Sequence, residues 1–254
     1  MRDPHVLSLY YTVSSHESIS YNTPKPVHFT NNIGEFNLTA GHLEVKPIEH
    51  FADEASVRTV IEPFLKSWEM EADLTSYLGM IRFQFVRSEI IDRDPPKPGE
   101  PINVHLRGTG GMVIGGSAII HIGLSKYPNP PTKFTTGPTV ELTYRRWCRF
   151  KEGKESLQSV SYFILTVIED VAGGREQAAN TFSIEKNVLG KIGKLSSTRG
   201  DANTARKAEA TLVDLTPAEK QWLEEATRRL VYRIGEHASG GSFNSLKFDD
   251  LPKI

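Results

Sequence analysis

The sequence predicts an α+β fold, in which a mainly antiparallel β domain with one long helix precedes a helical domain. Three patterns support this prediction. Residues 35–46 alternate apolar and polar side chains around a turn, residues 53–74 repeat apolar side chains at helical spacing, and the pattern becomes wholly helical beyond Lys151. The expected divisions are an α+β domain that recognises a ligand or partner (1–150), a helical domain (151–238) and a tail (239–254) that is flexible or docks as an extended peptide.

Short runs of apolar, aromatic and β-branched residues predict the strands of the first domain. The clearest pair is Glu35–Thr39 and His42–Lys46, joined by a turn at Ala40-Gly41. The alternation places Leu43 and Val45 on the core face of the second strand. Further strands are expected at Val6–Val13, Val27–Thr30, Gly79–Ile91, Ile102–Leu106, Ser117–Leu124 and Thr139–Phe150.

Three longer helices have recognisable ends. The first spans Asp53–Leu74 and contains Pro63, which is expected to kink or split it. Ser156 can cap a second helix that runs to Gly173, a residue that commonly ends helices. The third begins at the capping box Thr216-Pro217-Ala218-Glu219, which has proline at the first helical position.

The stretch from Gly173 to Leu195 has the spacing of two short helices joined by a tight turn. Its paired alanines favour a first helix over Arg175–Thr181 and permit close helix approach. Ser183 is a suitable N-cap for a second helix. That helix carries one apolar stripe, formed by Ile184, Val188, Ile192 and Leu195. These features are typical of a helix-turn-helix unit.

The sequence GGREQAANTFSIEKNVLGK in this stretch resembles the helix-turn-helix of Fis-type bacterial DNA-binding proteins. The alanine pair, Ile184 and Leu189 fall in register with that family, over less than a tenth of the chain. The resemblance implies that the second helix would enter a major groove. The nucleic-acid-binding residues expected on this basis are Lys186, Asn187 and Lys191, with Glu185 beside them and Arg175 as a further cation.

The stretch also departs from that family. Ser183 stands where the turn usually has glycine, and Thr181 replaces an apolar core residue. Gly190 and Gly193 lie inside the second helix, where each costs roughly 1 kcal/mol relative to alanine. The same glycines form a G-x-x-G, the loop by which KH modules clamp a nucleic-acid backbone, but a polar run follows instead of the strands of that module. A plain helical bundle that packs on the β-rich domain or on a partner is the remaining alternative.

Charge and composition limit the classes of function. The 254 residues carry a formal net charge of −1, which gives no global basic field. Between Gly173 and Ala210 seven basic residues stand against four acidic ones, and this local balance is compatible with phosphate contacts. The single cysteine, Cys148, precludes an intrachain disulfide and suits a reducing compartment, so a cytoplasmic location is expected. No apolar run approaches the ~18 residues of a membrane span, so no membrane partner is expected.

Signals for metal binding and catalysis are sparse. His105 and His121 would approach each other across a hairpin, and His42 and His50 lie elsewhere in the domain, but no H-x-H or H-E-x-x-H cluster supports a metal site. The segment RGTGGMVIGG lacks the spacing of a phosphate loop, and no G-x-S-x-G is present. We therefore expect no catalytic residue, metal site or cofactor.

The predicted function is a non-enzymatic binding protein, in which the β-rich domain is coupled to a nucleic-acid-binding helical domain. Two alternatives stay open. The helices could instead contact a protein partner within a larger complex, or the β-rich domain could hold an enzyme site, because active sites commonly assemble from residues far apart in sequence.

Overall fold

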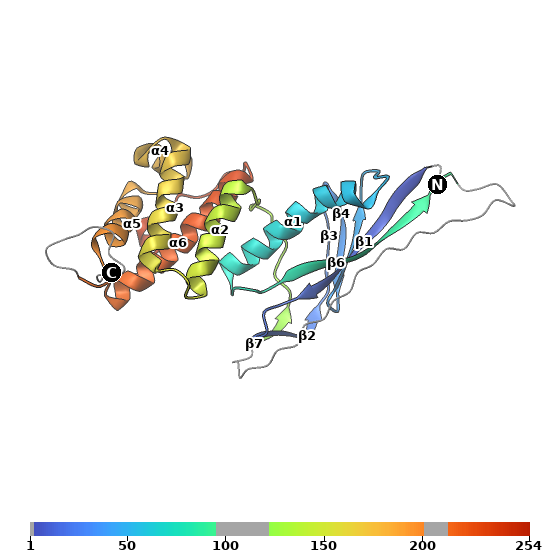
Figure 1. Ribbon diagram of the computed structural model, residues 1–254, viewed down its shortest axis with the longest axis horizontal. Coiled ribbons are helices and arrows are strands. Elements are labelled where there is room, and N and C mark those ends of the chain that lie inside the picture. The colour runs from blue at the N-terminus through green and yellow to red at the C-terminus, as the bar shows by residue number, and fades with distance from the viewer. Residues whose placement is uncertain (1–2, 95–121, 201–212) are drawn as a thin grey trace. The chain divides into compact units, whose positions relative to one another are not determined.

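The structure, a computed structural model, describes residues 3–94, 122–200 and 213–254. The chain divides into two compact units, residues 1–131 and 132–254. The first unit contains an antiparallel sheet with one long helix, and the second is helical (Figure 1). The α+β fold class predicted from the sequence is therefore confirmed.

The main sheet of the first unit has the strand order β3-β4-β5-β1-β6, and every neighbouring pair is antiparallel. Its strands are β1 (Pro4–Ser14), β3 (Val27–Thr30), β4 (Gly34–Thr39), β5 (His42–Pro47) and β6 (Arg82–Asp92). A separate parallel pair joins β2 (Ile19–Lys25) to β7 (Ile122–Lys126). The largely polar sequence of β2 has no clear alternation, so the sequence alone does not predict this strand.

The hairpin of β4 and β5 confirms the prediction from alternation. Ala40 and Gly41 have φ of 49° and 79°, as a two-residue type I′ turn requires. Leu43 and Val45 are fully buried, together with their cross-strand partners on β4. The N–H of Gly41 donates to Tyr127 Oη at 2.8 Å, which ties the turn to the segment that follows β7.

The helix α1 (Glu54–Thr75) packs on the sheet (Figure 1). Asp53 caps it, because its Oδ1 accepts a hydrogen bond from the N–H of Ser56 at 2.9 Å. Pro63 lies inside this helix without dividing it. The apolar face enters the same core as the hairpin through Val57, Ile61, Leu65 and Trp68.

The buried carboxylate of Asp73 anchors the connection from α1 to β6. Its Oδ1 accepts hydrogen bonds from the N–H groups of Gly79 at 2.8 Å and Met80 at 3.2 Å. Its Oδ2 lies 2.5 Å from Nη2 of Arg82, the first residue of β6. These contacts supply the acceptors that the buried turn needs.

The second unit consists of packed helices and a C-terminal segment. The helices are α2 (Pro138–Lys151), α3 (Leu157–Ala172), α4 (Arg175–Thr181), α5 (Lys186–Thr198) and α6 (Pro217–Ala238), and the segment contains a 3-10 turn, η1 (Phe248–Asp250). Ser161 on α3 and Thr227 on α6 share a buried hydrogen bond of 2.7 Å between their hydroxyls.

The prediction of a strand at Thr139–Phe150 is wrong, because this segment is α2. Its β-branched and aromatic residues favour a strand by composition. Its buried residues, however, are Val140, Thr143 and Trp147, which lie at helical spacing, and Pro138 occupies the first turn. Since α2 packs against α3 and α6, the helical unit begins before the division expected near Lys151.

The predicted start and end of α3 and the predicted start of α6 are confirmed. Ser156 caps α3 and Gly173 ends it with a left-handed φ of 81°. At α6 the N–H of Glu219 donates to Thr216 Oγ1 at 3.2 Å, and the N–H of Thr216 donates to Glu219 Oε2 at 3.1 Å. Both hydrogen bonds of the capping box are therefore present.

Some predictions fall on residues that the structure does not describe. The expected strand at 102–106, the glycine-rich segment and most of the strand at 117–124 lie outside the described ranges, and β7 begins at Ile122. Within those ranges, no helix combines the length and apolar character that crossing a membrane requires.

Candidate functional site

The stretch predicted to bind nucleic acid forms two helices, α4 and α5, joined by residues 182–185. Ala178 on α4 and Phe182, which directly follows this helix, are buried. Ser183 does not cap α5 as predicted, because the N-cap is Glu185, whose side chain accepts no hydrogen bond from the first turn of the helix. Ser183 instead has a φ of 50°, the left-handed conformation that glycine adopts most readily.

The helix α5 has one buried and one solvent-facing side. The predicted apolar stripe is confirmed, because Val188, Ile192 and Leu195 are fully buried and Ile184 is buried before the helix begins. At about 100° per residue the exposed arc spans about 140°. This exposed arc consists of Lys186, Asn187, Gly190, Lys191, Lys194 and Thr198, which are exposed or half-buried.

Two of the predicted cations are already engaged by carboxylates. Lys186 Nζ lies 3.2 Å from Glu176 Oε1 on α4. Arg175 Nε lies 2.5 Å from Glu169 Oε1 on α3, and the guanidinium of Arg175 rests over Gly193. These pairs reduce the positive charge that Lys186 and Arg175 offer to a ligand.

Lys191 and Lys194 differ from those cations. Within the described residues neither forms an ion pair, and both stand on the exposed arc of α5. Viewed down the helix axis, the exposed amide of Asn187 lies between the two lysines. Lys194 was not among the residues predicted to contact nucleic acid. Its position seven residues after Asn187, which is two helical turns, is the sequence signal that could have identified it.

The two glycines of α5 lie in different surroundings. A Cβ added to Gly190 would meet no heavy atom within 4 Å, so the centre of the exposed arc is open. A Cβ added to Gly193 would lie 3.0 Å from Nη2 of Arg175. Because both residues are inside a regular helix, the G-x-x-G does not form the loop that the KH interpretation requires.

The C-terminal segment, predicted to be flexible or to dock as an extended peptide, binds along the turn before α5. The N–H of Glu185 donates to the carbonyl of Leu246 at 3.0 Å, and the N–H of Leu246 donates to the carbonyl of Ser183 at 2.8 Å. Glu185 Oε2 also accepts from the N–H of Phe248 at 2.8 Å. Leu246 and Leu251 are buried. The carboxylate of Glu185 is therefore committed to the chain itself rather than to a ligand.

The histidines considered as metal ligands do not come together in the described residues. His105 and His121 lie outside those residues, and His42 is exposed on the hairpin. His50 stacks on His5, with 3.0 Å between their Nδ1 atoms. Partial burial, reinforced by the charge of Arg93, lowers the pKa of His5. In the part of the chain that the structure describes, no three metal-ligating side chains cluster.

A polar network covers the middle of the main sheet. The hydroxyl of Tyr10 lies 3.3 Å from Glu44 Oε1 and 3.2 Å from Glu89 Oε2, and Ser8 Oγ donates to Glu44 Oε1 at 3.0 Å. The guanidinium of Arg87 stacks over the Tyr10 ring at 3.8 Å. Burial and the charge of Glu44 raise the pKa of Tyr10, although the hydrogen bond with Ser8 opposes this. The phenol is therefore neutral and acts as a hydrogen-bond donor.

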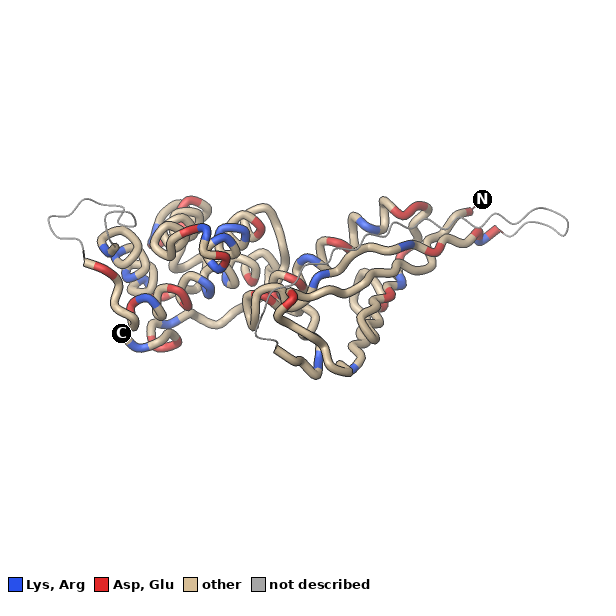
Figure 2. Tube along the Cα trace, turned by 60° about the horizontal axis from the view of Figure 1, so that its bottom comes forward, with Lys and Arg blue, Asp and Glu red and all other residues tan. Residues whose placement is uncertain are grey.

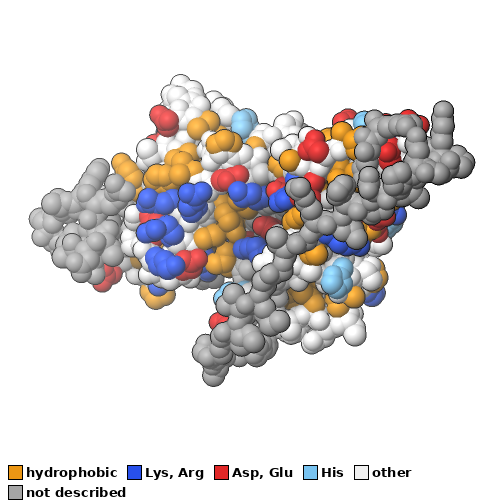
Figure 3. Space-filling view, turned by 45° about the vertical axis from the view of Figure 1, so that its right-hand side comes forward, with side chains coloured by type: hydrophobic (Ala, Val, Ile, Leu, Met, Phe, Trp, Pro, Cys, Tyr) orange, Lys and Arg blue, Asp and Glu red, His pale blue; other side chains and the backbone are white. Residues whose placement is uncertain are grey.

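Charge differs between the two units. Residues 132–254 contain 19 Lys and Arg against 16 Asp and Glu, a balance of +3 in a chain whose net charge is −1. Figure 2 shows both signs interspersed along the helices. Figure 3 shows Lys and Arg side chains gathered on one face of the helical unit, with hydrophobic and acidic side chains among them.

Comparison with protein-family models, curated proteins and solved structures finds no match to this chain. The resemblance to Fis-type proteins thus remains a local one, and α5 has to be judged by its own geometry.

Proposed function

We propose that the protein is a non-enzymatic binding protein whose helical unit contacts the backbone of duplex DNA through the exposed arc of α5. The observation that supports this most strongly is the pair Lys191 and Lys194. Both ammonium groups stand on one solvent-facing side of a helix, and neither is neutralised by a carboxylate of the described residues. Cations of this kind exchange counterions with phosphate and give binding that depends on salt.

The surroundings of these lysines favour close approach to a duplex. Gly190 leaves the middle of the arc without a side chain, so a phosphate backbone can come near the helix. Asn187 offers an amide that can donate to and accept from a base edge in a major groove. Lys186 adds a third ammonium, although its pairing with Glu176 must be exchanged for the phosphate contact.

The first unit has a recognition role in this proposal. Its sheet carries the fixed network of Tyr10, Glu44 and Glu89, which supplies hydrogen-bonding groups on a rigid surface. The network does not specify a ligand, so the testable part of the proposal lies on α5.

The test is a fluorescence anisotropy titration of a duplex with the full chain at several salt concentrations. Each neutralised phosphate contributes about 0.9 to the slope of log K against log salt. The double variant Lys191→Ala/Lys194→Ala is expected to flatten that slope by about two units and to weaken binding at low salt. Folding should be preserved, because both side chains lie off the buried stripe of α5.

Two further variants make the test specific. Lys154→Ala removes an exposed lysine at the loop between α2 and α3, and it should leave the slope unchanged. Glu176→Gln releases Lys186 from its ion pair and should tighten binding. No binding by wild type at micromolar protein, or equal slopes for wild type and the double variant, would overturn the proposal.

A further inference from the structure

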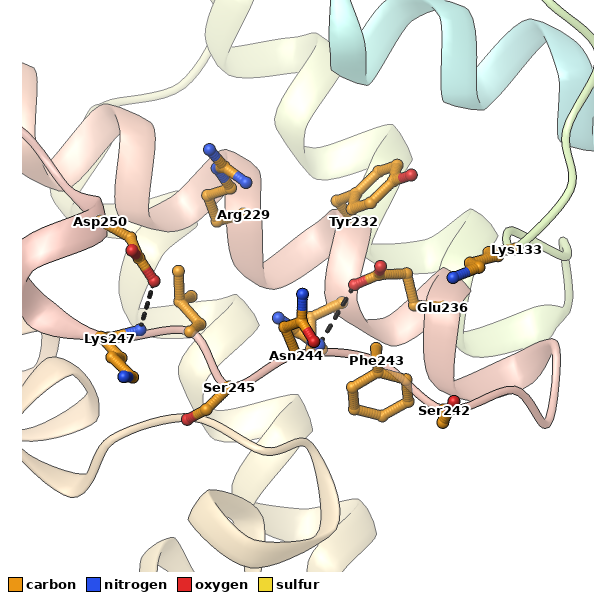
Figure 4. Close-up of a pocket in the computed structure, with 12 residues that line it drawn as sticks. Lys133, Arg229, Tyr232, Glu236, Ser242, Phe243, Asn244, Ser245, Lys247 and Asp250 are labelled. Carbon is orange, nitrogen blue, oxygen red and sulfur yellow. Dashed lines mark hydrogen bonds and ion pairs between the residues drawn. The ribbon is translucent and has the colours of Figure 1, made fainter.

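A cavity of about 870 Å³ lies within the helical unit, between α6 and the C-terminal segment (Figure 4). Its volume falls in the range of small-molecule sites. Four cationic side chains line it, against two carboxylates. The cations are Lys133, Arg229, Arg233 and Lys247, and the carboxylates are Glu236 and Asp250. The lining therefore has an excess of two positive charges.

Both carboxylates of the lining already have partners. Glu236 Oε2 lies 3.3 Å from Nη1 of Arg233. Asp250 Oδ2 accepts a hydrogen bond from the backbone N–H of Lys247 at 2.9 Å, which closes the 3-10 turn η1 (Figure 4). By contrast, the ammonium groups of Lys133 and Lys247 form no ion pair with any described residue. Their charge is available to a ligand.

Arg233 is the most constrained cation of the cavity. Its side chain is only 10% exposed, and its guanidinium carbon lies 4.6 Å from the centre of the Phe243 ring. Although Glu236 is at ion-pair distance, Nη1 donates no hydrogen bond within the described residues. A buried donor without an acceptor is costly, so the cavity holds a cation that an anion would stabilise. Burial accordingly lowers the pKa of Arg233.

We propose that this cavity binds a small molecule that carries a phosphate group, with Arg233 and Lys133 pairing with the phosphate and Lys247 adding positive charge at the opposite end of the cavity (Figure 4). A phosphate monoester carries a charge of about −1.5 to −2 at neutral pH, opposite in sign to the net charge of this lining, in which Arg229 is already paired with Glu225 at 2.9 Å. The hydroxyls of Ser242 and Ser245 and the amide of Asn244 line the same cavity and supply neutral hydrogen-bonding groups. This site is separate from the exposed arc of α5 and does not depend on duplex binding there.

The experiment is isothermal titration of the full chain with three phosphate-bearing probes: AMP, glucose 6-phosphate and inorganic pyrophosphate. Adenosine and glucose are the uncharged matches. At least one phosphate probe is expected to bind, whereas adenosine and glucose are not. Lys133→Ala/Lys247→Ala is expected to weaken that binding at least tenfold, whereas Lys154→Ala leaves it unchanged. Both lining lysines are exposed, so the double variant should fold, and circular dichroism verifies this.

A second arm separates a free phosphorylated molecule from the phosphates of nucleic acid. The Lys191→Ala/Lys194→Ala variant should retain binding of the probe, which shows that the cavity and α5 are distinct sites. Loss of probe binding in that variant would assign the phosphate to α5 and overturn the proposal. Absence of binding by all three probes, or equal affinity in wild type and the cavity variant, would also overturn it. Duplex binding that depends on Lys133 and Lys247, without probe binding, would identify a nucleic-acid contact instead.

Discussion

Substituting each glycine of α5 by alanine tests the geometry of this helix closely. Alanine is favoured over glycine inside a helix by about 1 kcal/mol. At Gly190 the added methyl group meets no atom within 4 Å, so Gly190→Ala should stabilise the fold by about that amount. For a unit of this size the melting temperature should rise by about 4 °C.

Gly193→Ala should behave differently, although it makes the same chemical change in the same helix. The new Cβ would lie 3.0 Å from Nη2 and 3.3 Å from Nη1 of Arg175, so the guanidinium must move away. That movement weakens its ion pair with Glu169, and partly exposed pairs of this kind contribute about 0.2–1 kcal/mol. The gain in helix propensity is thus largely cancelled, and a net change within about 0.5 kcal/mol is expected.

Thermal unfolding of both variants, followed by circular dichroism, measures the difference. In an Arg175→Ala background the obstacle is absent, so Gly193→Ala should recover the gain seen at Gly190. Equal stabilisation by the two substitutions in the wild-type background would contradict the packing of Arg175 over Gly193. A loss of stability in Gly190→Ala would contradict the open surroundings assigned to the exposed arc.

Four further substitutions test the fold by urea unfolding. Asp73→Ala should cost about 3 kcal/mol, because it removes the buried acceptor of two N–H groups and the partner of Arg82; an effect below 1 kcal/mol would contradict this role. Gly235→Ala should lower the free energy of unfolding by about 1–3 kcal/mol, because the new Cβ would lie 2.1 Å from the ring of Phe134. Phe134→Ala should relieve that overlap. An unchanged free energy of unfolding in Gly235→Ala would count against this packing. Partial burial opposes ionisation of Glu219, but hydrogen bonds and the charge of Arg199 outweigh it and lower its pKa. The stability that ionised Glu219 contributes is therefore present above its ordinary pKa of 4.5 and is lost as pH falls through the lower pKa of the folded state. The free energy of unfolding of Glu219→Gln should accordingly decrease less than that of wild type below pH 4.5. The same dependence on pH in both proteins would contradict the lowered pKa.

Features encoded within a few residues could be predicted from the sequence. The β4–β5 hairpin, the cap of α3 at Ser156 and the capping box at Thr216 each depend on residues no more than a few positions apart. The apolar stripe of α5 was likewise visible in its spacing. Composition misled the prediction at α2, where residues that favour strands form a helix because their buried positions recur at helical spacing.

Features that depend on distant residues could not be predicted. The strand β2 pairs with β7, which places Ile19 beside Ile122. No local sequence pattern predicts this pairing. The availability of Lys191 depends on which carboxylates lie near it in space, as the pairing of Lys186 with Glu176 from another helix illustrates. The cavity exists because the C-terminal segment returns to α6, and the sparse apolar residues of that segment do not specify this path.

Photo-crosslinking from α5 tests the central claim most directly. A photoreactive amino acid is placed at Asn187, on the exposed arc, and in a second protein at Lys154 as the control. Irradiation with a labelled duplex at low salt should yield a crosslink from position 187 that disappears as salt rises, and none from position 154. A folded protein that crosslinks only from position 154, or from neither position while the duplex is bound, would show that α5 is not the nucleic-acid surface.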